Sequence, residues 1–488
     1  MSRPFWDGAS GFRRKEFFRA DSSYQRLPRH PPATLKHKNL AIRRALFQLG
    51  AMNTSKADLN KSPDKRANIL LRLFGPGLVT GAADDDPSGI ATYSQAGAQF
   101  GYGLLWTVFL TTPFMIAIQL VSAQIGRVTG KGIIANVKDF APRWLVISLV
   151  SILVIANTFN IAADLAAMGE SLSLVIGGLN REHALIFAAT SVLLQVFVRY
   201  RRYAPALKIL TLVLFLYVAT AFTVHIPWGE AFARAVWPAA QVNRDYLLMV
   251  VAVLGTTISP YLFFWQASQE VEEMKQNQPR RPLNERRPLK ELLRGGESEI
   301  ARIALDTSIG MVFSNIIAFF IILTTAAVLN SSGVTNIRSA AEAAEALRPL
   351  AGDLTFILFA LGIVGTGLLA VPVLAGSAAY CVAEAFGWPA TLEAKAPDAV
   401  GFYSIIAAAT VVGLALGYTP IDPIQMLIWS AVLNGIVAVP IMTVMMVVVT
   451  RLSVMGRFSA RPTLTFFGWA GTALMVVTVI ALFWSSIG

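Results

Sequence analysis

The sequence has little charge and almost no cysteine or histidine. Only 14% of its 488 residues are charged, against about a quarter in an ordinary soluble domain. The single cysteine, Cys381, excludes a disulfide framework and a thiolate metal cage. The four histidines lie in the N-terminal region or near expected helix ends, which excludes a polyhistidine site within a membrane. Without a catalytic Cys or His arrangement or a phosphate-binding loop in an aqueous context, we expect no enzyme and no cofactor.

Apolar residues make up 55% of the chain, and the mean hydropathy is +0.57. A run of about 20 apolar residues is long enough to cross a bilayer as a helix. We expect an all-α integral membrane protein with eleven spans, at residues 71–98, 102–126, 144–177, 183–199, 205–226, 246–270, 303–330, 353–375, 400–418, 424–450 and 463–486. Residues 1–70 are polar and show no cleavable signal peptide, and residues 331–352 read as an Ala-rich surface helix.

The basic residues predict the orientation of the chain. With the N-terminus in the cytoplasm, inner connections carry 20 Lys and Arg and outer ones carry five, and residues 1–72 add 16 of the 41 in total. Such an excess on one side is typical of cytoplasmic loops. It places the C-terminus outside and accounts for the net charge of +12 without nucleic acid. We expect a bacterial inner membrane and a disordered basic cytoplasmic tail at residues 1–70. The alternative for that tail is contact with anionic lipid through a short amphipathic helix at residues 40–49.

Two of the apolar segments are interrupted. The first contains Gly75-Pro76-Gly77 and then Gly81-Ala82-Ala83-Asp84-Asp85-Asp86-Pro87-Ser88-Gly89, and the sixth contains Gly255-Thr256-Thr257-Ile258-Ser259-Pro260-Tyr261. Carboxylates within a membrane segment usually mark an ion or substrate pathway. Interruptions at corresponding positions of two halves indicate an inverted-repeat transporter with its site between them. We therefore expect repeats at 71–226 and 227–450, a charged cytoplasmic loop at 272–302, and an eleventh helix within 451–488.

At these residues the sequence resembles the NRAMP family of divalent-metal transporters. The resemblance is carried by the run from Gly75 to Pro87, by Gln95–Tyr102 and by Gly126–Gly130. It is dense over residues 70–140 and thin beyond 330. The resemblance implies the leucine-transporter-type fold, with helices 1–5 and 6–10 as inverted repeats, broken helices 1 and 6, and alternating access around a metal ion.

The chain departs from the family pattern at the metal ligands. Where the family has Asp-Pro-Gly-Asn, this chain has Asp86-Pro87-Ser88-Gly89, and Ser259 and Tyr261 replace the family's Met and His. Loss of a thioether favours hard ions, because Mg²⁺ prefers oxygen ligands and retained waters. This pattern is similar to the NRAMP-related magnesium transporters. The resemblance implies four metal ligands, which are Asp86, Ala83, Thr256 and Ser259. It implies that Asp85 adds a negative charge beside the metal. It also implies a cavity around the ligands that is lined by Gly89, Tyr261 and Gln266.

The groups expected for proton coupling are mostly missing. Where the family's third helix has Glu, Asp and Glu, this chain has Asn157, Asp164 and Ala167. We therefore expect transport of Mg²⁺ and Mn²⁺ without protons. The alternative is a proton-coupled Mn²⁺ or Fe²⁺ symporter with Asp164 and Asp306 as the relay. Asp164 could instead be bonded to Asn157 or Asn160, and Asp306 could pair with a cytoplasmic arginine. An organic-solute symporter would not explain the three aspartates beside the first interruption. A non-transporting sensor would not explain why two segments are interrupted at corresponding positions. The sequence predicts no oligomeric state.

Overall fold

The computed structural model describes residues 76–199, 202, 209, 212–238, 243–276, 287–292 and 295–486, and these are helical with short connections. The predictions for residues 1–70 lie outside this range. The α-helices are α3 (Pro76–Asp84), α4 (Pro87–Phe100), α5 (Leu105–Thr129), α6 (Ile133–Val137), α7 (Arg143–Ile176), α8 (Asn180–Phe197), α10 (Phe215–Ala221), α11 (Trp228–Val236), α12 (Arg244–Thr257), α13 (Pro260–Gln276), α14 (Glu297–Val328), α15 (Ala340–Ala344), α16 (Arg348–Ala351), α17 (Thr355–Phe386), α18 (Val400–Leu416), α19 (Pro423–Thr450), α20 (Leu452–Met455) and α21 (Pro462–Ser485).

The helices follow the expected membrane segments. Seven helical stretches within the described ranges are long and apolar enough to cross a membrane, and the shorter apolar helices Leu212–Ala221 and Val400–Leu416 lie at two further expected spans. Every expected segment overlaps a helix, although the fifth, 205–226, is described only in part. The all-α membrane fold is therefore confirmed.

Both expected helix breaks are present. At the first, α3 ends at Asp84 and α4 begins at Pro87, with Asp86 in extended conformation between them (φ −73°, ψ 170°). At the second, α12 ends at Thr257 and α13 begins at Pro260. Proline suits the first helical position because its missing N–H has no partner there, and an aspartate before it can cap the helix. A proline thus restarts the chain as a helix after each break, and Asp86 also caps the first of the two restarted helices.

Two glycines beside the breaks, Gly81 and Gly255, lie inside helices. A Cβ on Gly81 of α3 would collide with the backbone of Gly310 on α14, and one on Gly255 of α12 would collide with Ala431 and Gly435 on α19. Small residues let helix backbones approach closely in membrane proteins. Each broken helix is therefore held by a backbone contact with a later helix, within the last turn before its break.

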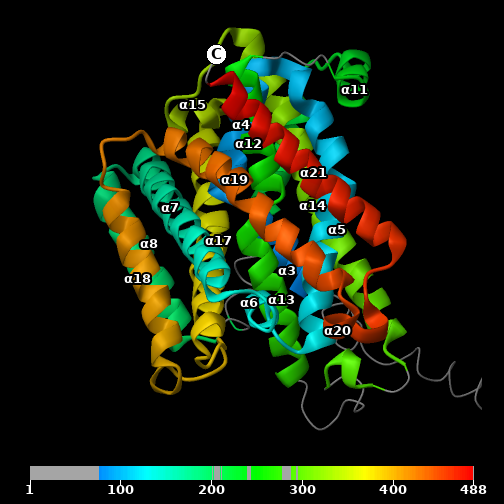
Figure 1. Ribbon diagram of the computed structural model, residues 1–488. Helices are drawn as coiled ribbons and strands as arrows, with labels where there is room; N and C mark the ends of the chain where they lie inside the picture. Colours follow the sequence, from blue (N-terminus) through cyan, green and yellow to red (C-terminus); the bar gives the residue numbers. More distant parts are fainter. Residues whose placement is uncertain are drawn as a thin grey trace, which may run out of the picture. The chain divides into compact units, whose positions relative to one another are not determined.

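The short helices lie at the two ends of the bundle. Figure 1 shows α6 and α20 at one end and α11 and α15 at the other, with the long helices between them. The basic connections at 131–143 and 451–461 adjoin α6 and α20, which agrees with the expected division of charge.

Two connections differ from expectation. The charged loop expected at 272–302 is shorter, because α13 continues to Gln276 and α14 begins at Glu297. The Ala-rich segment 331–352 does form short helices, but Ala340, Ala343 and Ala344 are buried. That segment covers the core and is more than a surface helix.

Candidate metal site at the helix breaks

Asp86 lies at the first break and meets Tyr261 from the second. Its Oδ1 accepts the Gly89 N–H at 2.7 Å, and its Oδ2 lies 3.1 Å from the Tyr261 hydroxyl. The same hydroxyl lies 3.1 Å from the carbonyl oxygen of Ala83. A phenol carries one proton, so it can donate to only one of the two oxygens at a time. A carboxylate and a carbonyl thus converge on one point, and oxygens of these two kinds are ligands of hard cations.

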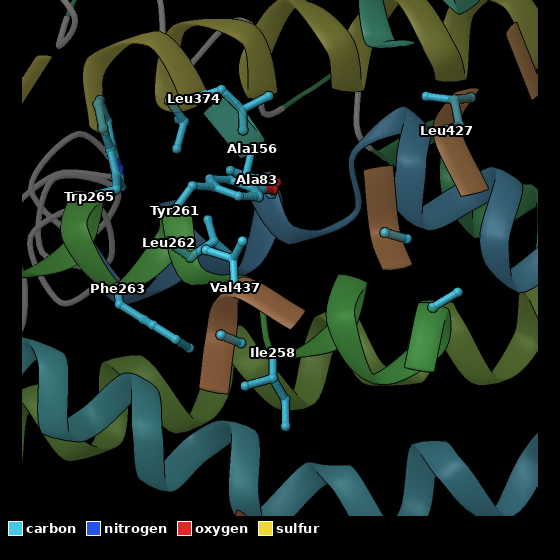
Figure 2. Packing of buried hydrophobic residues seen from close by; sticks show 14 of the residues in the cluster. Ala83, Ala156, Ile258, Tyr261, Leu262, Phe263, Trp265, Leu374, Leu427 and Val437 are labelled. Carbon is cyan, nitrogen blue, oxygen red and sulfur yellow. Dashed lines mark hydrogen bonds between the residues drawn. The ribbon is translucent and has the colours of Figure 1, made fainter. Parts of the chain in front are cut away.

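Apolar side chains surround this convergence point. Figure 2 shows Tyr261 against Ala83, with Ala156, Trp265 and Leu374 nearby. Tyr261 and Ala156 are fully buried, and Asp86 is 2% exposed. In surroundings of low polarity a carboxylate interacts more strongly with a cation than it does in water. The structure thus places a buried negative charge where both helices are interrupted.

Thr256, Ser259 and Gly89 lie at the same junction. The Ser259 hydroxyl donates to the Thr256 carbonyl at 2.6 Å and lies 3.1 Å from the carbonyl of Gly255. A Cβ on Gly89 would lie 3.2 Å from Thr256 Oγ1 and 3.4 Å from Asp86 Oδ1. The predicted ligands are therefore brought together, but the Ser259 hydroxyl and the Thr256 carbonyl are bonded to each other in this conformation. Their role as ligands requires that bond to open and stays a prediction.

Asp84 and Asp85 are bonded to α14. The Ser314 hydroxyl lies 2.6 Å from Asp84 Oδ2 and 3.1 Å from Asp85 Oδ1, and both aspartates are buried. The other Asp84 oxygen has no hydrogen-bond partner among the described residues. Asp85 is a neighbour of Asp86 in the chain, yet it bonds to Ser314 and not to Tyr261. Its role as a charge beside the metal stays a prediction.

Sequence reasoning missed Ser314, although a spacing signal was available. Asp306, Gly310 and Ser314 follow one another at intervals of four on α14, so they share one face of the helix. Asp306 accepts the N–H groups of Gly77 (2.7 Å) and Leu78 (3.3 Å) at the start of α3. Gly310 contacts the middle of α3, and Ser314 bonds its last residue. One face of α14 thus follows α3 from beginning to end.

Asp306, a predicted relay residue, and Gln266, a predicted cavity residue, are both hydrogen-bonded. Asp306 caps α3 through the contacts given above, and its expected pairing with a cytoplasmic arginine stays a prediction. Gln266 is fully buried, accepts a bond from Gln119 at 2.5 Å and donates to Thr307 at 2.8 Å. Tyr261 and Gln266 are both closed off in this conformation, so their exposure to a cavity stays a prediction.

Asp164 on α7 is buried close to the site. Neither of its carboxylate oxygens has a hydrogen-bond partner of normal geometry within the described ranges, although the Ser88 backbone N–H and the Asp86 carboxylate lie close enough to act on it. Asn157 donates to Leu374 and Ser377, and Asn160 donates to Ala156 and Asn434. The interpretation of Asp164 as a partner of these asparagines is therefore wrong, because Asn157 is engaged by α17 and Asn160 by its own helix and by α19.

A second buried charge cluster joins α13 to α14. Arg302 lies 3.5 Å from both Glu270 and Glu273 and 3.1 Å from Glu299, which also pairs with Arg127 at 3.7 Å. Glu270 lies at the expected end of the sixth apolar segment, yet it is fully buried. Burial of a carboxylate is tolerated when a guanidinium lies beside it. This cluster fixes the end of α13 that lies away from the break.

The site has one carboxylate with access to the convergence point. No group of three or more His, Cys, Asp or Glu side chains in the described part of the chain is placed to hold a metal ion. One carboxylate with backbone oxygens is a sparse ligand set, of the kind that leaves a hard cation several of its waters.

Comparison with known proteins decides the family. The sequence model of the natural resistance-associated macrophage protein-like (Nramp) family matches residues 77–485. The chain belongs to the Nramp family. Members of this family are membrane transporters, so the chain is a transporter and not an enzyme.

Individual relatives are distant. The divalent metal cation transporter MntH of Yersinia enterocolitica is 28% identical over 312 residues, which cover 63% of this chain and 71% of the relative. MntH of Pectobacterium carotovorum is 28% identical over 306 residues, covering 62% and 69%.

Solved structures agree on the fold. The manganese transporter of Eremococcus coleocola, solved with an aromatic bis-isothiourea compound, has a TM-score of 0.65 at 16% identity and covers 86% of this chain and 88% of its own. MhsT in complex with L-phenylalanine has a TM-score of 0.52 at 12% identity, covering 84% and 98%. These likenesses show that the Nramp chain has the leucine-transporter-type fold expected from its paired breaks.

Proposed function

We propose that this Nramp chain carries a divalent cation across the membrane by alternating access, through the site between its two helix breaks. The supporting observation is the convergence of the Asp86 carboxylate and the Ala83 carbonyl on the Tyr261 hydroxyl. The relatives named above as divalent metal cation transporters support the same substrate class. Asp86 is the essential ligand, with Ala83, Thr256 and Ser259 as further oxygen donors.

The ion is Mg²⁺, with Mn²⁺ as a second substrate. Residues 83–89 and 255–261 contain no Met, Cys or His, so the donors available at the two breaks are oxygens. Soft thioether and thiolate ligands select softer transition ions, whereas oxygen ligands suit Mg²⁺ and Mn²⁺. Asp85 contributes negative charge beside the site, and Gly89, Tyr261 and Gln266 line the cavity when the carrier opens.

Transport is driven by the membrane potential and is not coupled to protons. The N-terminus is cytoplasmic, the C-terminus is outside, and the membrane is the plasma membrane of a bacterium. A charge of +2 that moves inward across 100 mV gains about 4.6 kcal/mol, because each elementary charge gains about 2.3 kcal/mol. That gain suffices for uptake of Mg²⁺ without a second ion.

One observation favours the alternative, a proton-coupled Mn²⁺ or Fe²⁺ symporter. Asp164 is a buried carboxylate near Asp86, and in the part of the chain described no side chain bonds to its two oxygens. A proton relay needs groups that can load and release protons, and the only other candidate, Asp306, is engaged at the start of α3. The second half of a relay is therefore poorly placed.

Substitution of Asp86 tests the site. Asp86→Ala and Asp86→Asn should abolish Mg²⁺ uptake into proteoliposomes and Mg²⁺ binding measured by calorimetry, because each removes the buried charge. Asp139→Asn is the matched control, since Asp139 is an exposed carboxylate paired with Lys131. Uptake by Asp86→Ala at the rate of the unmodified chain would show that the site assignment is wrong.

A further inference from the structure

A groove lies between α5, α14 and the segment that leads into α21. It has a volume of about 810 Å³, within the ~300–1,000 Å³ range of small-ligand sites. Its apolar wall includes Pro113, Ile116 and Leu120 of α5 and Leu464 and Phe467 of α21. Because α5 and α21 are membrane helices, this wall lies at the depth of lipid acyl chains.

The polar lining of the groove is confined to one end. Gln124 lies near the end of α5, Glu297 begins α14, and Arg457 and Arg461 precede α21. Figure 1 shows the end of α5, the start of α14 and α20 at the same end of the bundle. Pro113 lies 11 residues before Gln124, which is about 16 Å of helix and about half of the ~30 Å hydrocarbon core. The groove is thus polar at a membrane surface and apolar through one leaflet.

The polar end carries a positive charge. The connection 451–461 holds three arginines and no acidic residue. The Arg457 guanidinium donates to the Gly295 carbonyl at 2.5 Å and lies 4.7 Å from the Phe458 ring, contacts that orient it. Arg461 is exposed and forms no ion pair with a described residue. Glu297 opposes them with a single charge, so the lining has a net charge of +1.

We propose that this groove binds an acidic phospholipid, with the phosphate at Arg457 and Arg461 and one acyl chain along Leu120, Ile116 and Pro113. Guanidinium groups form paired hydrogen bonds with phosphate oxygens, and basic sites between membrane helices recognise anionic headgroups. The volume suits one acyl chain better than a whole lipid, so the second chain remains in the bilayer.

A second copy of the chain is a less suitable occupant. A two-fold contact through this face would bring the arginines of both copies together, since each copy presents the same patch. Repulsion between like charges opposes that contact, whereas a phosphate neutralises the same arginines.

The test measures lipid binding to the full chain purified in detergent, by native mass spectrometry. Phosphatidylglycerol and phosphatidylcholine are offered at equal concentration. We expect at least fivefold tighter binding of phosphatidylglycerol, and Arg457→Gln/Arg461→Gln should remove that preference. Leu120→Trp, which fills the groove, should weaken binding of phosphatidylglycerol without a change in charge. Arg143→Gln, an exposed arginine at the start of α7, is the matched control and should bind like the unmodified chain.

Several outcomes would overturn the proposal. One is equal affinity for the two lipids in the unmodified chain, a measurement that stands even if a variant fails to fold. Another is a loss of the preference for phosphatidylglycerol that is as large in Arg143→Gln as in the double variant. Displacement of the lipid by inorganic phosphate alone would indicate a soluble anion in place of a lipid. If the unmodified chain forms dimers and Leu120→Trp dissociates them, the groove is occupied by a second copy of the chain. None of these readouts depends on transport.

Discussion

The Tyr261 hydroxyl lies 3.1 Å from Asp86 Oδ2 and 3.1 Å from the Ala83 carbonyl, and so a residue of the second helix break closes the first. Both oxygens belong to the proposed metal site. An entering cation therefore takes over these two acceptors. The conformation described is closed at the site, and on binding the hydroxyl releases both oxygens and turns its own oxygen to the ion or to one of the ion's waters.

Tyr261→Phe removes this hydroxyl and keeps the ring. Asp86 then retains the Gly89 N–H but loses its second neighbour, and the ion loses an oxygen that could hold it or one of its waters. A hydrogen bond to a charged group contributes about 1.5–3 kcal/mol. We expect the KM for Mg²⁺ uptake to rise about tenfold with the protein still folded. An unchanged KM would show that the phenol plays no part in binding.

Ser259→Met should change which ion is preferred. The substitution frees the Thr256 carbonyl from its 2.6 Å bond and adds a thioether beside the site. Sulfur favours softer ions, so uptake of Cd²⁺ and Mn²⁺ should rise relative to Mg²⁺. Ser259→Ala frees the same carbonyl without adding sulfur and is the matched control. Equal ion ratios in the two variants would argue against a thioether effect.

Asp306→Asn separates a capping role from a proton relay. The carboxylate accepts two N–H groups at the start of α3, where negative charge is favourable. Asparagine keeps one acceptor oxygen, so we expect transport close to normal. Asp306→Ala should lower the free energy of unfolding by about 1 kcal/mol, as loss of a helix cap does. Loss of all transport in the asparagine variant, with the fold intact, would instead favour the relay.

Gly310→Ala should destabilise the chain. A methyl group there would collide with the backbone of Gly77 on α3, and backbone cannot move aside as a side chain can. Overpacking of this kind costs about 1–3 kcal/mol, so the apparent unfolding temperature in detergent should fall. Gly229→Ala in α11 is the control, because nothing lies within 4 Å of the added Cβ. Equal unfolding temperatures in both variants would contradict the close α3–α14 contact.

The fold could be predicted largely from the sequence because its signals are local. Proline, glycine and aspartate within apolar segments predict the two breaks at Asp86 and Pro260, and both are present. Helix ends near charged loops were less predictable: the residues from Glu270 to Gln276 continue α13, because Arg302 on another helix stabilises the buried Glu270. A single sequence does not reveal that such a partner exists.

The bonds within the site could not be predicted, because they join residues far apart in the chain. Tyr261 and Asp86 are 175 residues apart, and Ser314 and Asp84 are 230 apart. The sequence indicated that Tyr261 borders the site but not that its hydroxyl closes the break. Ser314 resembles any serine in an apolar helix until the packing of α14 along α3 is known.

The most direct test of the account is Mg²⁺ uptake into proteoliposomes under an imposed inside-negative potential, with internal pH recorded in parallel. The account predicts entry of Mg²⁺ without acidification of the lumen, and loss of entry in Asp86→Ala. Entry of Mn²⁺ accompanied by acidification, with no entry of Mg²⁺, would contradict it and would make Asp164 the leading candidate for a proton carrier.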